Sequence, residues 1–197
     1  MQLRSNFLAA LAVQALFANE ALSFESIVRP FFPAMQEAMQ KTGAGFNWAN
    51  HEVHTDDGYI LNLFRLLPAG VKRASDCADC FGQPVFLMHG MGANGSRWLN
   101  RINEDIDPLA IALAKRGYDV WLGNGRGNHM SSEHEHLNWI IDEEKYWDYS
   151  YPEMATNDLP AMLNTVYEET GRQKINYIGI SLGTTQVLYA LSHEKTQ

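Results

Sequence analysis

The stretch Lys174–Gln186, KINYIGISLGTTQ, contains a strand-like run, a serine between two glycines and a helix-like run. Gly179-Ile180-Ser181-Leu182-Gly183 is therefore a G-x-S-x-G pattern placed where an apolar strand ends and a helix begins. A serine in that turn sits on a strained backbone as an exposed nucleophile, and the small residues at 179 and 183 let strand and helix pack closely. We interpret Ser181 as a nucleophile, with an ordinary turn serine as the alternative.

Strands and helices alternate along the chain that leads to this turn. From Pro84 onward the order is PVFLMH, DPLAIALAKRG, YDVWL, NDLPAMLNTVYEETG and INYIGI. In the fourth segment we expect Asp158 to cap a helix, with Pro160 in its first turn and Gly171 at its end. Strict alternation predicts right-handed crossovers and an α/β fold with a mostly parallel sheet.

The region before Pro84 has a different pattern. A helix is expected after Pro33, where Met35 and Met39 share one face. Two strand-like runs, His51–Thr55 and Tyr59–Leu66, flank the turn Asp56-Asp57-Gly58, which predicts a hairpin at the front of the domain. No repeat or linker divides the chain further.

Two backbone N–H groups are candidates for stabilising a developing oxyanion. In a hydrolase of this kind one donor follows the nucleophile and the other lies in the loop after an earlier strand. Leu182 supplies the first, and Met91 in His89-Gly90-Met91-Gly92 is our candidate for the second, with a pocket-wall role as its alternative. Because the backbone donates, the side chains at 91 and 182 matter little to this task.

The same loop also matches a nucleotide-binding pattern. Gly90–Gly95 reads G-x-G-x-x-G, but a dinucleotide fold needs an acid at the carboxyl end of the next strand, and Asp119 stands at the start of YDVWL. A nicotinamide-dependent oxidoreductase therefore remains a distant alternative. Asn94-Gly95-Ser96 is a glycosylation sequon close to the expected active-site mouth.

The composition and the first residues predict the class of partner and the cellular location of the protein. The 197 residues carry a net charge of -8 without a basic run, which argues against a nucleic-acid binder. Residues 1–23 have Arg4 ahead of a short apolar run and then small residues, so we expect a signal peptide there and the hydrolase domain over 24–197. An amphipathic first helix is the alternative. No later segment offers the unbroken apolar length of a transmembrane helix.

Two clusters invite a metal or redox interpretation. Cys77 and Cys80 lie among turn residues, which favours a structural disulfide loop over a redox pair, although the sequence alone leaves the bond open. The histidines in NHMSSEHEHLN, residues 128–138, match no zinc spacing, so we interpret them as a solvated loop and expect neither a metal nor a cofactor.

These motifs together resemble a known family. EVHTDDGYILNLFRLLP, PVFLMHGMGANGSRWL, LAIALAKRGYDVWLGNGRGN, YWDYSYPEMATNDLPAML and YIGISLGTTQ, in this order, resemble the acid lipases, the α/β-hydrolases that include gastric and lysosomal acid lipase. The resemblance begins near Asn47 and corresponds to the amino-terminal half of that family. It implies a secreted or lysosomal (vacuolar) hydrolase of triacylglycerols or sterol esters that works at a lipid–water interface without a metal. It assigns the nucleophile to Ser181 and the oxyanion donors to the backbones of Met91 and Leu182.

The chain also departs from the family pattern. Ile180 and Leu182 replace the histidine and glutamine that usually flank the nucleophile, which makes the pocket more apolar and leaves substrate choice open. The triad acid and base should follow Ser181 along the chain, yet only His193 and Glu194 do, and His193 is about 18 Å away along a continued helix. We therefore expect a fold truncated after the nucleophile turn and without appreciable lipase activity. A non-catalytic lipid- or partner-binding remnant is the rival hypothesis.

Overall fold

The structure is a computed structural model that describes residues 31–103 and 105–193. The predicted signal peptide, residues 1–23, lies outside the described residues. The chain divides into two compact units, Met1–Phe32 and Pro33–Gln197. Of the first unit only Phe31 and Phe32 are described, at the start of helix α3 (Phe31–Thr42).

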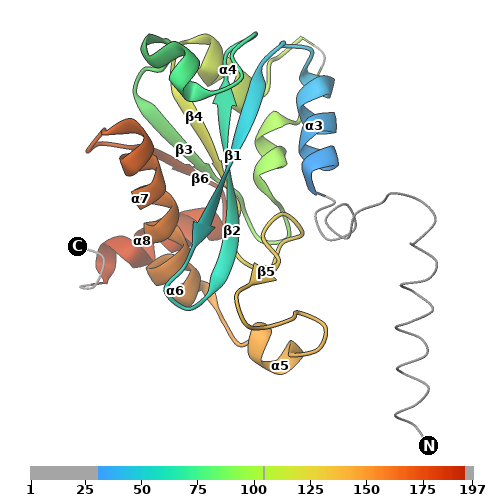
Figure 1. The fold of residues 1–197 in the computed structure, drawn as a ribbon, viewed down its shortest axis with the longest axis vertical. Helices are drawn as coiled ribbons and strands as arrows, with labels where there is room; N and C mark the ends of the chain where they lie inside the picture. The colour runs from blue at the N-terminus through green and yellow to red at the C-terminus, as the bar shows by residue number, and fades with distance from the viewer. Residues whose placement is uncertain (1–30, 104, 194–197) are drawn as a thin grey trace, which may run out of the picture. The chain divides into compact units, whose positions relative to one another are not determined.

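One mixed sheet organises the second unit (Figure 1). Within the described residues the strands follow the order β1-β2-β4-β3-β6, and the short β5 pairs with β2. The adjacent strands β4, β3 and β6 are parallel, as predicted, whereas β1, β2 and β5 pair antiparallel. The strand bounds are Asn47–His54 (β1), Tyr59–Leu67 (β2), Pro84–Met88 (β3), Asp119–Gly123 (β4), Glu133–His134 (β5) and Asn176–Gly179 (β6).

The front hairpin forms where the sequence predicts it. Gly58 has a φ of 92°, a conformation that favours glycine, and its N–H donates to the carbonyl of Thr55 over 3.0 Å. The register pairs His54 with Ile60 and Asn47 with Leu67, so β1 and β2 are joined along their whole length. The turn therefore fixes the position of Asp57, which becomes important at the pocket.

Helices cover both faces of β3 and β4, which explains why every residue of these two strands is buried. On one face Phe86, Met88 and Trp121 pack in a core with residues of α7 (Leu159–Thr170) and α8 (Leu182–Ser192). The alternating residues of the same strands point to the other face, where α4 (Leu109–Lys115) and the 3-10 turn η2 (Gly95–Leu99) contact β4.

The helix that contains Asp158 begins earlier than predicted. Its first turn is α6 (Tyr151–Glu153), which continues through the π-helical segment η3 (Met154–Asp158) into α7. Ser150 and Glu153 form a capping box, in which Glu153 Oε2 accepts the Ser150 N–H over 2.8 Å. The predicted cap at Asp158 is therefore wrong, because that carboxylate lies inside the helix and binds elsewhere. Gly171 does end the helix, with a φ of 64°.

Two local features complete the frame. Cys77 and Cys80 form a disulfide within the 3-10 segment η1 (Ala74–Cys80), in line with the structural interpretation of this pair. Helix α5 (Glu143–Tyr146) precedes α6 and carries the buried Tyr146. Among the residues that the structure describes, no helix has the length and apolar character that crossing a membrane requires.

Candidate active site

Ser181 occupies the junction between β6 and α8 in a strained conformation. Its φ of 51° and ψ of −116° make it the single non-glycine residue with positive φ among those the structure describes. A residue other than glycine adopts a positive φ of this kind only when the surrounding structure holds it there, at a cost of ~1–3 kcal/mol. The carbonyls of Ile180 and Ser181 accept the N–H groups of Gly183 and Thr184 over 3.0 and 2.9 Å, so α8 starts directly behind the serine.

The flanking glycines permit this tight turn. A β-carbon on Gly183 would stand 2.7 Å from the carbonyl oxygen of Met88 and 2.8 Å from that of His89. A β-carbon on Gly179 would stand 2.8 Å from the backbone of Gly183 and Thr184. Both contacts are shorter than real β-carbons show, so strand and helix approach each other here only because these positions lack side chains.

The loop after β3 lies against the serine. A β-carbon on Gly90 would stand 3.1 Å from the β-carbon of Ser181, and the N–H of Ile180 donates to the Met88 carbonyl over 3.1 Å. Met91, the next residue, has a side chain that is 80% exposed. Within the described part of the chain, the backbone N–H groups of Met91 and Leu182 have no protein acceptor.

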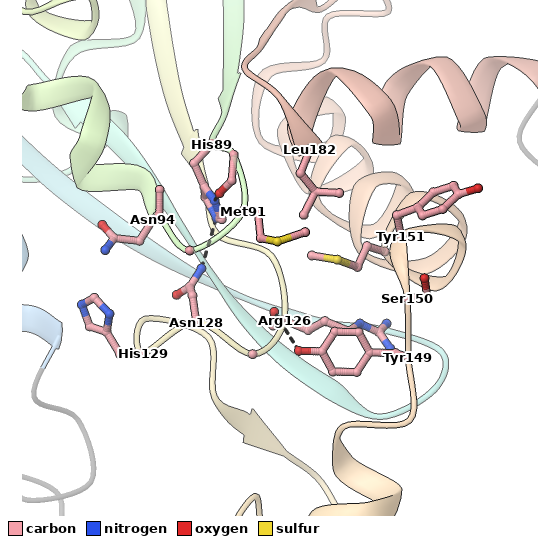
Figure 2. Close-up of a pocket in the computed structure, with 15 residues that line it drawn as sticks. His89, Met91, Asn94, Arg126, Asn128, His129, Tyr149, Ser150, Tyr151 and Leu182 are labelled. Atoms are coloured by element: carbon pink, nitrogen blue, oxygen red, sulfur yellow. Dashed lines mark hydrogen bonds between the residues drawn. The ribbon is translucent and has the colours of Figure 1, made fainter.

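A pocket of about 580 Å³ opens beside this junction. Figure 2 shows Met91 and Leu182 on one side of it and Arg126, Asn128 and Tyr149 on the other. Ser181 is not among the lining residues, but it adjoins the lining residue Leu182 in sequence and Gly90 in space. The pocket therefore begins where the two candidate oxyanion donors lie.

The far wall of the pocket rests on an ion network around the buried Arg126 that the sequence did not reveal. Arg126 binds Asp158 through Nε at 2.8 Å and Asp57 through Nη1 and Nη2 at 2.6 and 2.9 Å. Asp158 also accepts the backbone N–H of Arg126 at 2.9 Å, and the guanidinium lies 3.9 Å from the ring centre of Tyr59. The hairpin turn, the loop after β4 and the helical segment η3 are thus joined at one cation.

Burial disfavours the charged forms of the two carboxylates that bind Arg126. Burial raises the pKa of Asp158 to about 6, although the neighbouring guanidinium favours the charged form. The pKa of Asp57 stays below its usual value, because hydrogen bonds from Arg126 and Thr55 outweigh its partial burial. The motif GNGRGN, residues 123–128, and the turn at Asp57 were the available signals, but neither indicates that these residues meet.

His89 is the other buried titratable group beside the pocket. It is the first residue of the loop after β3, and burial lowers the pKa of its ring despite the hydrogen bond to Gly90. The sequence suggested His89 only as part of the loop that carries Met91. Of the histidines further along, His129 lines the pocket, while His134 binds the carbonyl of Asp57 at 3.1 Å. Among the described residues, no group of three or more His, Cys, Asp or Glu side chains is placed to hold a metal ion.

The remaining predicted positions lie away from Ser181 or have other partners. His193 stands at the opposite end of α8 and stacks on Tyr189 with ring centres 5.5 Å apart, while Glu194 lies outside the described residues. Asp119 is buried in a bidentate ion pair with Arg65. Asn94 borders the pocket, and its side-chain oxygen accepts hydrogen bonds from the backbone and hydroxyl of Ser96.

Comparison with known proteins places this geometry in a family. Residues 83–197, more than half of the chain, match the family described as "alpha/beta hydrolase fold". The chain belongs to the α/β-hydrolase family. Residues 38–102 also match the family described as "partial alpha/beta-hydrolase lipase region".

Individual relatives of this α/β-hydrolase are lipases by name. It is 40% identical over 149 residues to human lipase member M, and 41% identical over 149 residues to human lysosomal acid lipase/cholesteryl ester hydrolase. These alignments cover 75% of the chain and 33% and 35% of the two relatives. Rat gastric triacylglycerol lipase is 39% identical over 153 residues, which cover 77% of the chain and 37% of that protein. The chain thus spans about a third of the length of these relatives.

A solved structure supports the fold alone. An esterase of Pyrococcus furiosus superposes with a TM-score of 0.52 at 18% identity, over 78% of this chain and 48% of the esterase. The predicted resemblance to the acid lipases and the predicted α/β-hydrolase fold are both confirmed.

Proposed function

We propose that this chain supplies the nucleophile and the oxyanion donors of a serine hydrolase that cleaves carboxylic esters of lipids, triacylglycerols or sterol esters. The observation that carries the proposal is the left-handed backbone of Ser181 at a strand–helix junction, directly against the loop that holds Met91. Strain of this kind persists at functional sites, and this junction is where an α/β-hydrolase places its nucleophile. The lipase names of the relatives suggest lipid esters as the substrates.

The chemistry follows from these positions. The Oγ of Ser181 gives up its proton to a base or to water and forms a bond to the ester carbonyl carbon. One carbonyl electron pair moves onto the oxygen, which becomes negative until the alcohol leaves with a proton and the carbonyl re-forms. The N–H groups of Met91 and Leu182 then stabilise that charge, a contribution of ~10²–10³ in rate for each donor. Among the described residues, none forms a hydrogen bond with Ser181 Oγ. The described residues therefore offer no base at the serine, and we infer slow turnover for the chain as given.

A ligand with a strongly activated carbonyl tests the nucleophile directly, because it adds a serine hydroxyl far more readily than an ester does. An alkyl trifluoromethyl ketone forms a tetrahedral adduct with a serine in an oxyanion hole, and ¹⁹F NMR separates the adduct from the free ketone. We expect an adduct signal with the 197-residue chain and none with Ser181→Ala. Binding of the ketone that persists unchanged in Ser181→Ala would instead favour the non-catalytic lipid-binding hypothesis.

Two further observations concern the cellular location of the protein and the alternative of a nicotinamide-dependent oxidoreductase. The bonded Cys77–Cys80 pair fits an oxidising compartment, which supports entry into the secretory route, and the relatives' names include lysosomal and gastric enzymes. Amino-terminal sequencing of the product from a secreting host would test the expected cleavage near residue 23.

No observation at the site favours a nicotinamide cofactor, because the carboxylate of Asp119 already binds Arg65.

A further inference from the structure

His89 has one defined tautomer in this structure. Its Nδ1 lies 2.8 Å from the carbonyl oxygen of Gly90, and a carbonyl only accepts, so Nδ1 carries the proton. On the other side of the ring, Nε2 receives the N–H of Gly125 at 3.3 Å and the Nδ2 amide of Asn128 at 3.1 Å. The imidazole therefore donates at one nitrogen and accepts at the other, and is neutral.

The orientation of the Asn128 amide is fixed by its other partners. Its Oδ1 accepts the N–H of Met130 at 2.7 Å, and its Nδ2 donates to the carbonyl of Gly125 at 3.0 Å. Exchanging the oxygen and nitrogen of this amide would break both hydrogen bonds. Asn128 therefore presents an N–H to His89, and Figure 2 shows this amide directed at the ring.

The hydrogen bond to Gly90 reaches the candidate oxyanion donor. In a planar trans peptide the C=O and the following N–H point in opposite directions, so a ring that holds the Gly90 oxygen also sets the direction of the Met91 N–H. No peptide bond among the described residues is cis. Gly90 is itself in close contact with Ser181, as its β-carbon position lies 3.1 Å from the serine β-carbon. Rotation of this one peptide would aim the Met91 donor away from the reacting group.

We propose that His89 is a positioning residue, held in its Nδ1–H tautomer by Asn128 and Gly125, that aims the Met91 N–H at the oxyanion of the Ser181 adduct. The proposal rests on the proposed function for its chemical meaning. A buried histidine with satisfied nitrogens is commonly a core residue, but this ring is bonded to the one peptide that carries the donor. A carbonyl held in place before the reaction also lowers the reorganisation that charge stabilisation requires.

The free protein tests the tautomer and the peptide orientation. Long-range ¹H–¹⁵N NMR of the His89 ring should show a protonated Nδ1 and an unprotonated Nε2 at neutral pH. Asn128→Asp keeps the acceptor for Met130 but offers no N–H to Nε2, so we expect the Nε2 resonance to move toward its protonated position. A wild-type ring protonated at Nε2, or an Nε2 resonance unchanged in Asn128→Asp, would overturn the proposal.

Two substitutions at position 89 separate positioning from packing. The amide nitrogen of asparagine can take the place of Nδ1, whereas that of glutamine takes the place of Nε2, so His89→Asn retains the donor to Gly90 and His89→Gln loses it. We expect the Met91 amide resonance to shift in His89→Gln far more than in His89→Asn. We also expect the trifluoromethyl ketone adduct to weaken ~10-fold in His89→Gln alone, less than the loss of a whole donor.

The outcomes distinguish this inference from the proposed function. If the wild-type chain forms no adduct, the proposed function fails, while the Met91 amide resonance in the two variants still decides the orientation by His89. If the adduct forms and His89→Gln weakens it no more than His89→Asn does, the positioning role is overturned. Amide spectra that keep the wild-type dispersion show that each variant is folded. If His89→Gln does not fold, Asn128→Ala should then shift the Met91 amide, and an unchanged resonance overturns the inference.

Discussion

The two walls of the pocket are built in opposite ways. On the side of Ser181, backbone groups face the pocket, glycines permit close approach, and the Met91 side chain is 80% exposed. On the far side, buried charged side chains hold the loop after β4, with Asp158 fully buried and Arg126 only 3% exposed. The near wall therefore depends on the absence of side chains and the far wall on their identity.

This difference determines which substitutions should matter. On the far wall, removing one ion leaves its partner buried without compensation, which is among the largest effects of a single substitution. On the near wall, adding a methyl group at a glycine should be harmful, while truncating an exposed side chain should not be. Unfolding in urea, followed by circular dichroism, ranks these effects on one scale.

The largest loss is expected for Arg126→Met. This change leaves the buried carboxylate of Asp158 without its cation and should lower the free energy of unfolding by ~3–5 kcal/mol at pH 7. Because burial already raises the pKa of Asp158 to about 6, the variant can protonate this group, and the loss should shrink near pH 5. The midpoint of urea unfolding at the two pH values measures both effects.

The matched control is the double variant Arg126→Met with Asp158→Leu. It removes both charges at once, so it should be less destabilised than Arg126→Met alone. Equal or greater loss in the double variant would show that the two side chains contribute through packing and not through their charges.

The second loss is expected on the near wall, for Gly183→Ala. The new β-carbon would meet the carbonyl oxygens of Met88 and His89 at 2.7 and 2.8 Å, and both belong to backbone that cannot move freely. We expect a loss of ~1–3 kcal/mol, typical of overpacking. Thr185→Ala, at an exposed position of the same helix, should change the unfolding midpoint little. Similar midpoints for the two variants would contradict the close approach of α8 to β3.

These two walls also differ in how far the sequence predicted them. The near wall follows from local pattern, because G-x-S-x-G between a strand and a helix fixes both the backbone and the need for glycine. The far wall depends on residues 32 to 100 positions apart in the chain, such as Arg126 with Asp158 and Asn157 with Asp57. Asp158 has the local signature of a helix cap, but the helix starts at Tyr151, where the capping box of Ser150 and Glu153 is a competing local signature.

A smaller effect is expected from pH at His89, which lies between the two walls. Its pKa is lowered from 6.5 because burial disfavours the charged ring, so the folded protein binds fewer protons than the unfolded chain near that pH. The contribution of His89 to the free energy of unfolding is therefore fully present above pH 6.5, and it is lost as the pH falls toward the lowered pKa. His89→Asn should remove this part of the pH dependence of the free energy of unfolding.

The comparison of wild type with His89→Asn is necessary because other groups titrate nearby in pH. Burial also lowers the pKa of His51, whereas the raised pKa of Asp158 acts with the opposite sign. The difference between the two unfolding curves from pH 7.5 to 5.5 isolates His89. A difference that does not vary with pH would mean that His89 titrates alike in the folded and unfolded states.

The smallest effect is expected for Met91→Ala. The side chain is 80% exposed, so its truncation removes little apolar area from the folded protein, and the free energy of unfolding should stay within ~0.5 kcal/mol of wild type. Met91 carries a candidate oxyanion donor, yet that donor belongs to the backbone, which the substitution retains. A loss above ~1 kcal/mol would show that the near wall also depends on side-chain packing, and the contrast between the two walls would no longer hold.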